Sequence, residues 1–345
     1  MGTRRIRKLN KTRRKHGGAK LGEGVRGIAY DTYSESGDSL YSLAKSNKTS
    51  KIELFFADGN SQTITDENKI ENLYESLKSL TDSISKIFKP SRFFSLTSAS
   101  KEFSGEIETN KRVVDLYGLK NAVKYSTLTG VELDGKNISG AIFYGKTNIY
   151  AIFNRKCIGE YDMDIKQFTL DILESLNNFS ENHNDIKLDN IVKCSDRYKL
   201  IDWDKNASKD KIITASTSTT NPVKLFLVFK FSAIVKMIFT KRNPQAKKWF
   251  ILSEATATTE FKETYNRIML EYEDEVNSKS KKQLFEKYKD TFDVFSFGMT
   301  ILYAVIHFKL DYQKYKPLIE ALTSLKDPLN AKEGLAFAKK FFKKQ

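Results

Sequence analysis

The chain has 345 residues with 40% hydrophobic content, which provides for one large core or two modest lobes and excludes a disordered protein. Its formal net charge of +15 indicates a polyanionic partner. It has no apolar leader, and no apolar run reaches the roughly 20 residues needed to cross a bilayer, so we expect neither secretion nor a transmembrane segment.

Much of the positive charge lies in residues 1–19, which we expect to form a disordered basic tail. Its expected partner is nucleic acid, an anionic membrane or a nuclear-import receptor, and a solvated tail that aids solubility is the alternative. The two cysteines, Cys157 and Cys194, lack the spacing of a zinc site. We expect them to be buried thiols in a reducing, intracellular compartment.

Strands and helices are predicted in the first part of the chain. Residues 20–46 alternate apolar and small residues around glycines, which predicts a strand, a glycine turn and two further strands. A hairpin is predicted over residues 51–64. Apolar residues at helical spacing predict one helix over residues 66–88, and a second helix is predicted over residues 101–120. Residues 138–153 read as two strands about a turn.

From residue 162 the pattern changes to helices, beginning with residues 162–179, whose apolar residues share one face. The charged, turn-rich passage before it is the expected hinge. The sequence therefore predicts an α+β, two-lobed fold. Its expected parts are the tail, a small β-rich N-lobe with an insertion over residues 20–155, and a larger helical C-lobe over residues 156–345.

Three glycines, Gly22, Gly24 and Gly27, form a G-x-G-x-x-G pattern. This pattern alone is weak, because dinucleotide-binding folds also use it. In those folds the glycines open a helix, whereas here residues 28–30 continue as a strand. A glycine turn between strands lets backbone N–H groups approach phosphates, so we interpret this segment as a loop that covers ATP.

The strongest pattern is "SENHNDIKLDNIVKCSDRYKLIDWDK", residues 180–205. These residues resemble the catalytic loop and the metal-binding motif of eukaryotic-type protein kinases. The resemblance implies that Asp185 accepts the proton of the attacking hydroxyl and that Lys187 neutralises charge on the transferring phosphoryl group. It also implies that Asn190 and Asp202 hold the Mg²⁺ ions that bridge the ATP phosphates. An ordinary surface ion pair between Asp185 and Lys187 is the alternative.

The resemblance extends through much of residues 20–330. The stretch "TFDVFSFGMTILYAVI" resembles the central helix of the kinase large lobe, in which Asp293 would accept backbone N–H bonds from the catalytic loop. "YSLAK" resembles the strand whose lysine, here Lys45, grips the α- and β-phosphates, with Lys51 and Lys101 as competitors. Four candidates for the glutamate that pairs with this lysine stay open: Glu71, Glu75, Glu106 and Glu108.

The chain departs from the kinase pattern at several positions. Asn184 stands where many kinases have an arginine that binds a phosphorylated activation loop, so we expect activity without that switch. Trp203 and Asp204 replace the phenylalanine and glycine of D-F-G, which changes the packing and reduces the backbone freedom. Residues 205–290 form an unusually long activation segment without A-P-E, which puts peptide-substrate recognition in doubt more than ATP chemistry.

The resemblance implies an ATP- and Mg-dependent Ser/Thr protein kinase that acts on a protein substrate, with Lys187 as its Ser/Thr-type feature. A small-molecule kinase of the aminoglycoside or choline type is one alternative, and a pseudokinase that serves as a binding or virion-structural module is another. The style of the sequence is similar to kinases of large DNA viruses, which implies host cytoplasm or the virion. Two apolar and basic stretches, residues 225–239 and 336–345, are expected either to pack in the large lobe or to contact a membrane or partner.

Overall fold

The computed structural model has two compact units, one within residues 1–112 and 123–160 and the other within residues 113–122 and 161–345. The predicted lobe limits stay predictions. The residues that the structure describes are 20–23, 28–31, 49–56, 60–77, 84–88, 96–121, 123, 132–133, 135–144, 149–153, 162–194, 197–203, 207–208 and 258–345.

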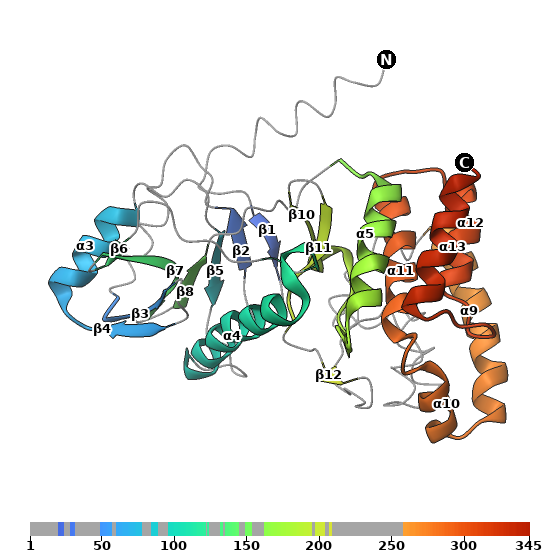
Figure 1. Cartoon of the computed structure of the whole chain (residues 1–345), viewed down its shortest axis with the longest axis horizontal. Coiled ribbons are helices and arrows are strands. Elements are labelled where there is room, and N and C mark those ends of the chain that lie inside the picture. Colours follow the sequence, from blue (N-terminus) through green and yellow to red (C-terminus); the bar gives the residue numbers. More distant parts are fainter. Residues whose placement is uncertain are drawn as a thin grey trace, which may run out of the picture. The chain divides into compact units, whose positions relative to one another are not determined.

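The first unit is built on one antiparallel sheet with strand order β1-β2-β5-β8-β7-β3-β4, and β6 pairs with β7 (Figure 1). Branched and aromatic residues at alternate positions form its buried side, as at Ile52 and Leu54. The strands are β1 (Lys20–Glu23), β2 (Ile28–Asp31), β3 (Lys51–Phe56), β4 (Ser61–Ile64), β5 (Ile84–Phe88), β6 (Glu132–Leu133), β7 (Lys136–Tyr144) and β8 (Ile149–Phe153).

The predicted hairpins 51–64 and 138–153 are confirmed as β3 with β4 and β7 with β8. The single helix predicted over residues 66–88 is wrong in its second half. Helix α3 (Glu67–Leu77) ends at Leu77, and β5 pairs with β2 and β8. A short apolar run fits the spacing of a helix and that of a strand, and here pairing with neighbouring strands makes residues 84–88 a strand. The second predicted helix is confirmed as α4 (Leu96–Asn121), which bends at Gly118 with φ 72°.

The second unit is mainly helical and contains two small antiparallel sheets. One sheet pairs β10 (Ile191–Cys194) with β11 (Arg197–Leu200), and the other pairs β9 (Glu181–Asn182) with β12 (Ala207–Ser208). None of the helices among the described residues is both long and apolar enough to span a bilayer. The helices are α5 (Ile165–Asn178), α9 (Thr259–Ser278), α10 (Lys281–Tyr288), α11 (Phe292–His307), α12 (Tyr312–Leu322) and α13 (Ala331–Lys343).

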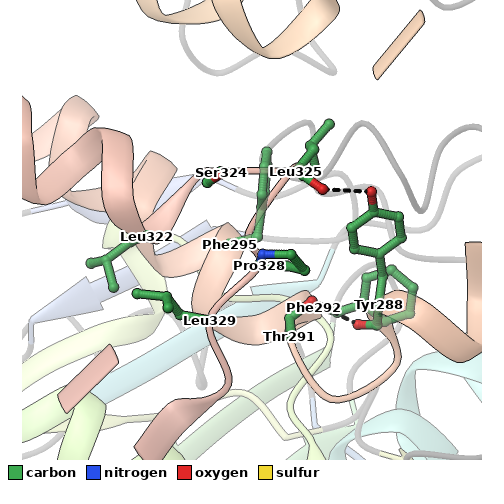
Figure 2. Close-up of a pocket in the computed structure, with 9 residues that line it drawn as sticks. All are labelled: Tyr288, Thr291, Phe292, Phe295, Leu322, Ser324, Leu325, Pro328 and Leu329. Atoms are coloured by element: carbon green, nitrogen blue, oxygen red, sulfur yellow. Dashed lines mark hydrogen bonds between the residues drawn. The ribbon is translucent and has the colours of Figure 1, made fainter. Parts of the chain in front are cut away.

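Helix α11 lies in the core of this unit, because it is apolar nearly all round and most of its residues are buried. Gly298 lets it pack closely, since a Cβ there would lie 2.7 Å from Thr323 Cγ2. Its start is fixed at a small, mostly apolar pocket (Figure 2). There the Tyr288 hydroxyl donates to the Leu325 carbonyl oxygen at 2.8 Å. The Thr291 hydroxyl donates to the Tyr288 carbonyl oxygen at 3.0 Å, which joins the N-cap of α11 to the end of α10.

The expectation of buried thiols is wrong for Cys194. It lies at the end of β10, is 6% exposed and is bonded in a disulfide. Its burial agrees with the prediction, but its oxidation state does not. Spacing along the chain cannot reveal a pairing that depends on the fold. The other cysteine, Cys157, lies outside the described residues.

Candidate active site

The loop before η1 (Leu188–Asn190) is fixed by a buried carboxylate. Asp293, in the first turn of α11, accepts the backbone N–H of His183 at 2.5 Å and that of Asn184 at 3.1 Å. A charged acceptor on backbone donors makes a short, strong hydrogen bond. This arrangement agrees with the role that the kinase resemblance implied for Asp293. The backbone immediately before Asp185 is therefore held in one conformation.

His183 braces the same loop from inside. Its Nδ1 accepts the N–H of Asp185 at 3.3 Å, which assigns the ring proton to Nε2 for donation to the Ile201 carbonyl oxygen at 3.0 Å. Complete burial lowers the pKa of His183, against the opposing effects of the Asp293 and Asp185 carboxylates. The imidazole is therefore neutral and structural, and it joins the loop to the strand end that precedes Asp202.

Two of the predicted site residues, Lys187 and Asn190, donate to one side-chain oxygen of a third, Asp185. Lys187 Nζ lies 3.0 Å from Asp185 Oδ2, and Asn190 Nδ2 donates to the same atom at 3.2 Å and to the Asp185 carbonyl oxygen at 2.8 Å. Asp185 is 1% exposed, whereas the Lys187 side chain is 31% exposed. Two donors on a buried carboxylate hold it in one orientation, with its cationic neighbour reaching toward solvent.

The electrostatics of Lys187 are set by this group. Burial alone would lower its pKa, but the Asp185 carboxylate, with smaller contributions from Asp202 and Asp189, raises it above the ordinary value. Lys187 is therefore cationic at neutral pH. Because Asp202 contributes to the pKa of both Lys187 and His183, its carboxylate lies within electrostatic range of the loop.

The β10–β11 hairpin brings Asn190 and Asp202 to the same end. Ile191 pairs with Leu200 in the antiparallel register, and the Ile201 N–H donates to the Asn190 carbonyl oxygen at 2.9 Å. Asn190 directly precedes one strand and Asp202 follows the other by two residues. Asp202 has φ 67°, in the left-handed region that aspartate tolerates better than most residues. Residues that are far apart in the sequence thus become neighbours.

Trp203 fixes the residue after this strand end. It is 2% exposed, its Nε1 donates to the Leu200 carbonyl oxygen at 3.3 Å, and its ring meets His183 edge-on at 4.5 Å. Phe179 approaches it at 4.7 Å and Tyr117 of α4 stacks on it at 6.1 Å. Aromatic packing of this density restrains the backbone next to Asp202.

The oxygen donors of this site fit Mg²⁺. Asn190 and Asp202 offer an amide oxygen and a carboxylate, which are the hard ligands that Mg²⁺ prefers. The Asn190 amide is oriented by its bonds to Asp185, as expected where neighbouring groups fix a ligand. Among the described residues, no group of three or more His, Cys, Asp and Glu side chains is placed to hold a metal ion. A site that shares its ion with a phosphate substrate needs only one or two protein carboxylates.

The structure describes only some of the phosphate-binding residues that were predicted. Gly22 lies in β1 opposite Ala29, next to an irregularity in the pairing. Gly24, Gly27 and Lys45 lie outside the described residues, as does Asp204.

The competing lysines and the candidate glutamates lie on the elements of the first unit. Lys51 lies in β3 with its Nζ 4.5 Å from the centre of the Tyr144 ring. The candidates Lys101, Glu106 and Glu108 are on α4, and Glu71 and Glu75 are on α3. Glu71 and Glu108 are exposed.

Two supporting residues were missed by sequence reasoning. Thr300 lies seven residues after Asp293 on the same face of α11, and its hydroxyl reaches the Ile186 carbonyl oxygen at 3.4 Å. Tyr117 comes from a distant helix and also contacts the Ser180 hydroxyl at 3.1 Å. The i, i+7 spacing could have indicated Thr300 once Asp293 was chosen, whereas no local signal indicates Tyr117.

No protein-family model matches the chain, and no curated protein matches it. One solved structure with a partial match is described as a kinase domain, is 14% identical, and aligns over 56% of this chain and 51% of that chain with a TM-score of 0.27. The match therefore spans about half the length of that domain's chain. A similarity of this size carries no argument about fold or function.

Proposed function

We propose that this chain is an ATP- and Mg-dependent phosphotransferase, and specifically a Ser/Thr protein kinase. The observation that supports this most is the convergence of Lys187 and Asn190 on Asp185 in a loop held by Asp293. A structural ion pair would not need a buried acidic residue, an amide donor and a rigid backbone at one point. A base that must meet a substrate hydroxyl in one geometry does need them.

In the proposed reaction each residue of the loop has one task. Asp185 accepts the proton of the substrate hydroxyl. As it does so, the hydroxyl oxygen bonds to the γ-phosphorus of ATP, and the bond between the γ-phosphorus and the β-phosphate oxygen breaks. Lys187, cationic and partly exposed, stabilises negative charge on the transferring group. Asn190 and Asp202 would hold Mg²⁺, which when bound neutralises the phosphate oxygens.

ATP would be held by Gly22, Gly24, Gly27 and Lys45, as the kinase resemblance implies. Protein hydroxyls are the proposed acceptors, because Lys187 matches the Ser/Thr type. An arginine at position 184 could bind a phosphate on the activation segment. Asn184 instead donates its Nδ2 to the Asn182 carbonyl oxygen at 3.2 Å, which supports activity without phosphorylation of that segment. The basic tail remains a proposed polyanion contact, and a viral origin with action in host cytoplasm or the virion remains a proposal.

Calorimetric titration of the full chain with ATP, with and without Mg²⁺, tests this proposal when combined with transfer of labelled phosphate to a basic acceptor protein. We expect Asp202→Asn to lose the Mg-dependent part of ATP binding. Asp185→Asn should bind Mg-ATP normally but lose transfer. Asp327→Asn, which removes an exposed carboxylate on a distant loop, is the control and should behave like the unmodified protein.

Three outcomes would contradict the proposal. ATP binding that is unaffected by Mg²⁺ and by Asp202→Asn would remove the metal role of this residue. A complete absence of ATP binding would favour a pseudokinase, and transfer only to aminoglycosides or choline would favour a small-molecule kinase.

A further inference from the structure

Helix α13 packs on the second unit by one face only (Figure 1). Its buried residues Gly334, Ala338 and Phe342 recur at every fourth position, and the helix contacts α5 and α12. Gly334 permits a close approach, because a Cβ there would lie 3.2 Å from Leu322 Cδ2. The opposite side of α13 is exposed.

The exposed side of α13 is strongly basic. Its only carboxylate, Glu333, is engaged in the capping box and accepts the Asn330 N–H at 3.0 Å. Within the described part of the chain, no salt bridge neutralises the lysines of this side. We call these exposed lysines the basic face of α13: Lys332, Lys339, Lys340, Lys343 and Lys344.

Aromatic side chains lie next to the basic face. Phe337 is 36% exposed, one of three exposed large hydrophobic residues described in this unit together with Leu116 and Leu270, and Phe341 is partly buried. Phe337 thus gives the exposed side of the helix one apolar side chain. Lysine stems can lie along such a surface while the ammonium groups stay in water.

The positive charge continues beyond the end of the helix. An open hollow beside Phe342 is lined by Lys166 of α5 and Lys314 of α12, both exposed. The acidic residue in this hollow, Asp164, caps α5 by accepting the N–H groups of Lys166 and Gln167 at 3.1 and 3.0 Å. Exposed lysines of α5 and α12 therefore line a hollow next to the C-terminal end of α13.

We propose that the basic face of α13 docks the protein on a membrane that contains anionic lipids. A cluster of lysines on an amphipathic helix with an exposed aromatic residue suits the charged, partly apolar boundary of such a bilayer. Nucleic acid suits it less, because the face has no arginine for bidentate phosphate or guanine contacts and lies on a convex helix, not in a groove. The proposal is independent of the proposed kinase activity.

Flotation of the full chain with phosphatidylcholine vesicles, with or without phosphatidylserine, tests this docking. The test variant changes three lysines of the basic face to glutamine: Lys332, Lys340 and Lys343. The matched control removes the same charge from exposed lysines elsewhere in the second unit: Lys262, Lys282 and Lys326. Both variants keep residues 1–19, so any binding by the tail is common to them.

Each lysine near an anionic surface changes binding roughly fivefold, about 1 kcal/mol, so the test variant should bind on the order of 100-fold more weakly than the control. Added salt should weaken binding of the unmodified protein, and Phe337→Ser should weaken it further. If the triple variant unfolds, the vesicle binding of Phe337→Ser tests the proposal: weaker binding than that of the unmodified protein supports it, and unchanged binding overturns it. Equal binding by the two triple variants would overturn the proposal, as would tighter binding to duplex DNA that only the test variant loses.

Discussion

Asp293→Asn should both destabilise the second unit and disable the proposed catalytic loop. The carboxylate is 6% exposed and accepts two backbone N–H groups, from His183 and Asn184. An asparagine oxygen can keep one of these bonds, but its NH₂ group then faces the other donor. The substitution removes one charge-assisted hydrogen bond and leaves one buried backbone N–H without an acceptor, which together cost about 3 kcal/mol. Asp293→Ala removes both acceptors and should cost about 3–6 kcal/mol.

Urea unfolding followed by circular dichroism measures this cost, with Asp274→Asn as a control that removes an exposed carboxylate of α9. The control should change the free energy of unfolding by less than about 0.5 kcal/mol. An Asp293→Asn protein as stable as the control would refute the view that Asp293 holds the loop. Retention of full phosphotransfer activity in that variant would refute its link to catalysis.

Three other predictions follow from individual contacts. Gly298→Ala should lower the free energy of unfolding by about 1–3 kcal/mol in urea, because its Cβ would lie 2.7 Å from Thr323 Cγ2, whereas Gly105→Ala meets no atom within 4 Å and should stabilise α4 by up to about 1 kcal/mol. Burial lowers the folded pKa of His183 below its ordinary 6.5, so the unfolded chain takes up the proton first as the pH falls. The stability that the neutral ring contributes is fully present above pH 6.5 and is lost as the pH falls below it. In urea unfolding, the free energy of unfolding should therefore fall by up to about 1.4 kcal/mol per pH unit below that pH, and the His183→Gln variant should lack this fall. Lys187→Met should lower kcat on the order of 100-fold, and it should also lower the free energy of unfolding because it leaves the buried Asp185 carboxylate without its cation; a normal kcat would contradict its proposed role.

Elements with a strong period were predictable from the sequence. The apolar spacing of α5 predicted its position within a few residues, the resemblance to kinases predicted that of α11, and the turn signals predicted the β3–β4 hairpin. The region of β5 was not predictable, because Ile84, Ile87 and Phe88 satisfy a helical spacing and a short strand equally well. Its pairing with β2 and β8 comes from residues distant in the sequence.

The composition of the site was also predictable, but its geometry was not. Motif spacing indicated Asp185, Lys187 and Asn190, and the structure brings them together on one carboxylate oxygen. The left-handed backbone at Asp202 and the aromatic contact between Trp203 and Tyr117 depend on the folded chain. Such long-range contacts leave no periodic signal, so only the folded structure reveals what restrains the site.

We propose that Asp185 acts as the base in phosphoryl transfer from ATP. Single-turnover transfer of labelled γ-phosphate tests it most directly, with the unmodified protein and Asp185→Asn both saturated with Mg-ATP and acceptor protein. The proposed mechanism predicts a rate lower by roughly 100- to 10,000-fold in the variant, with unchanged ATP affinity and stability. Equal rates in the two proteins would contradict the assignment of Asp185 and of the catalytic loop around it.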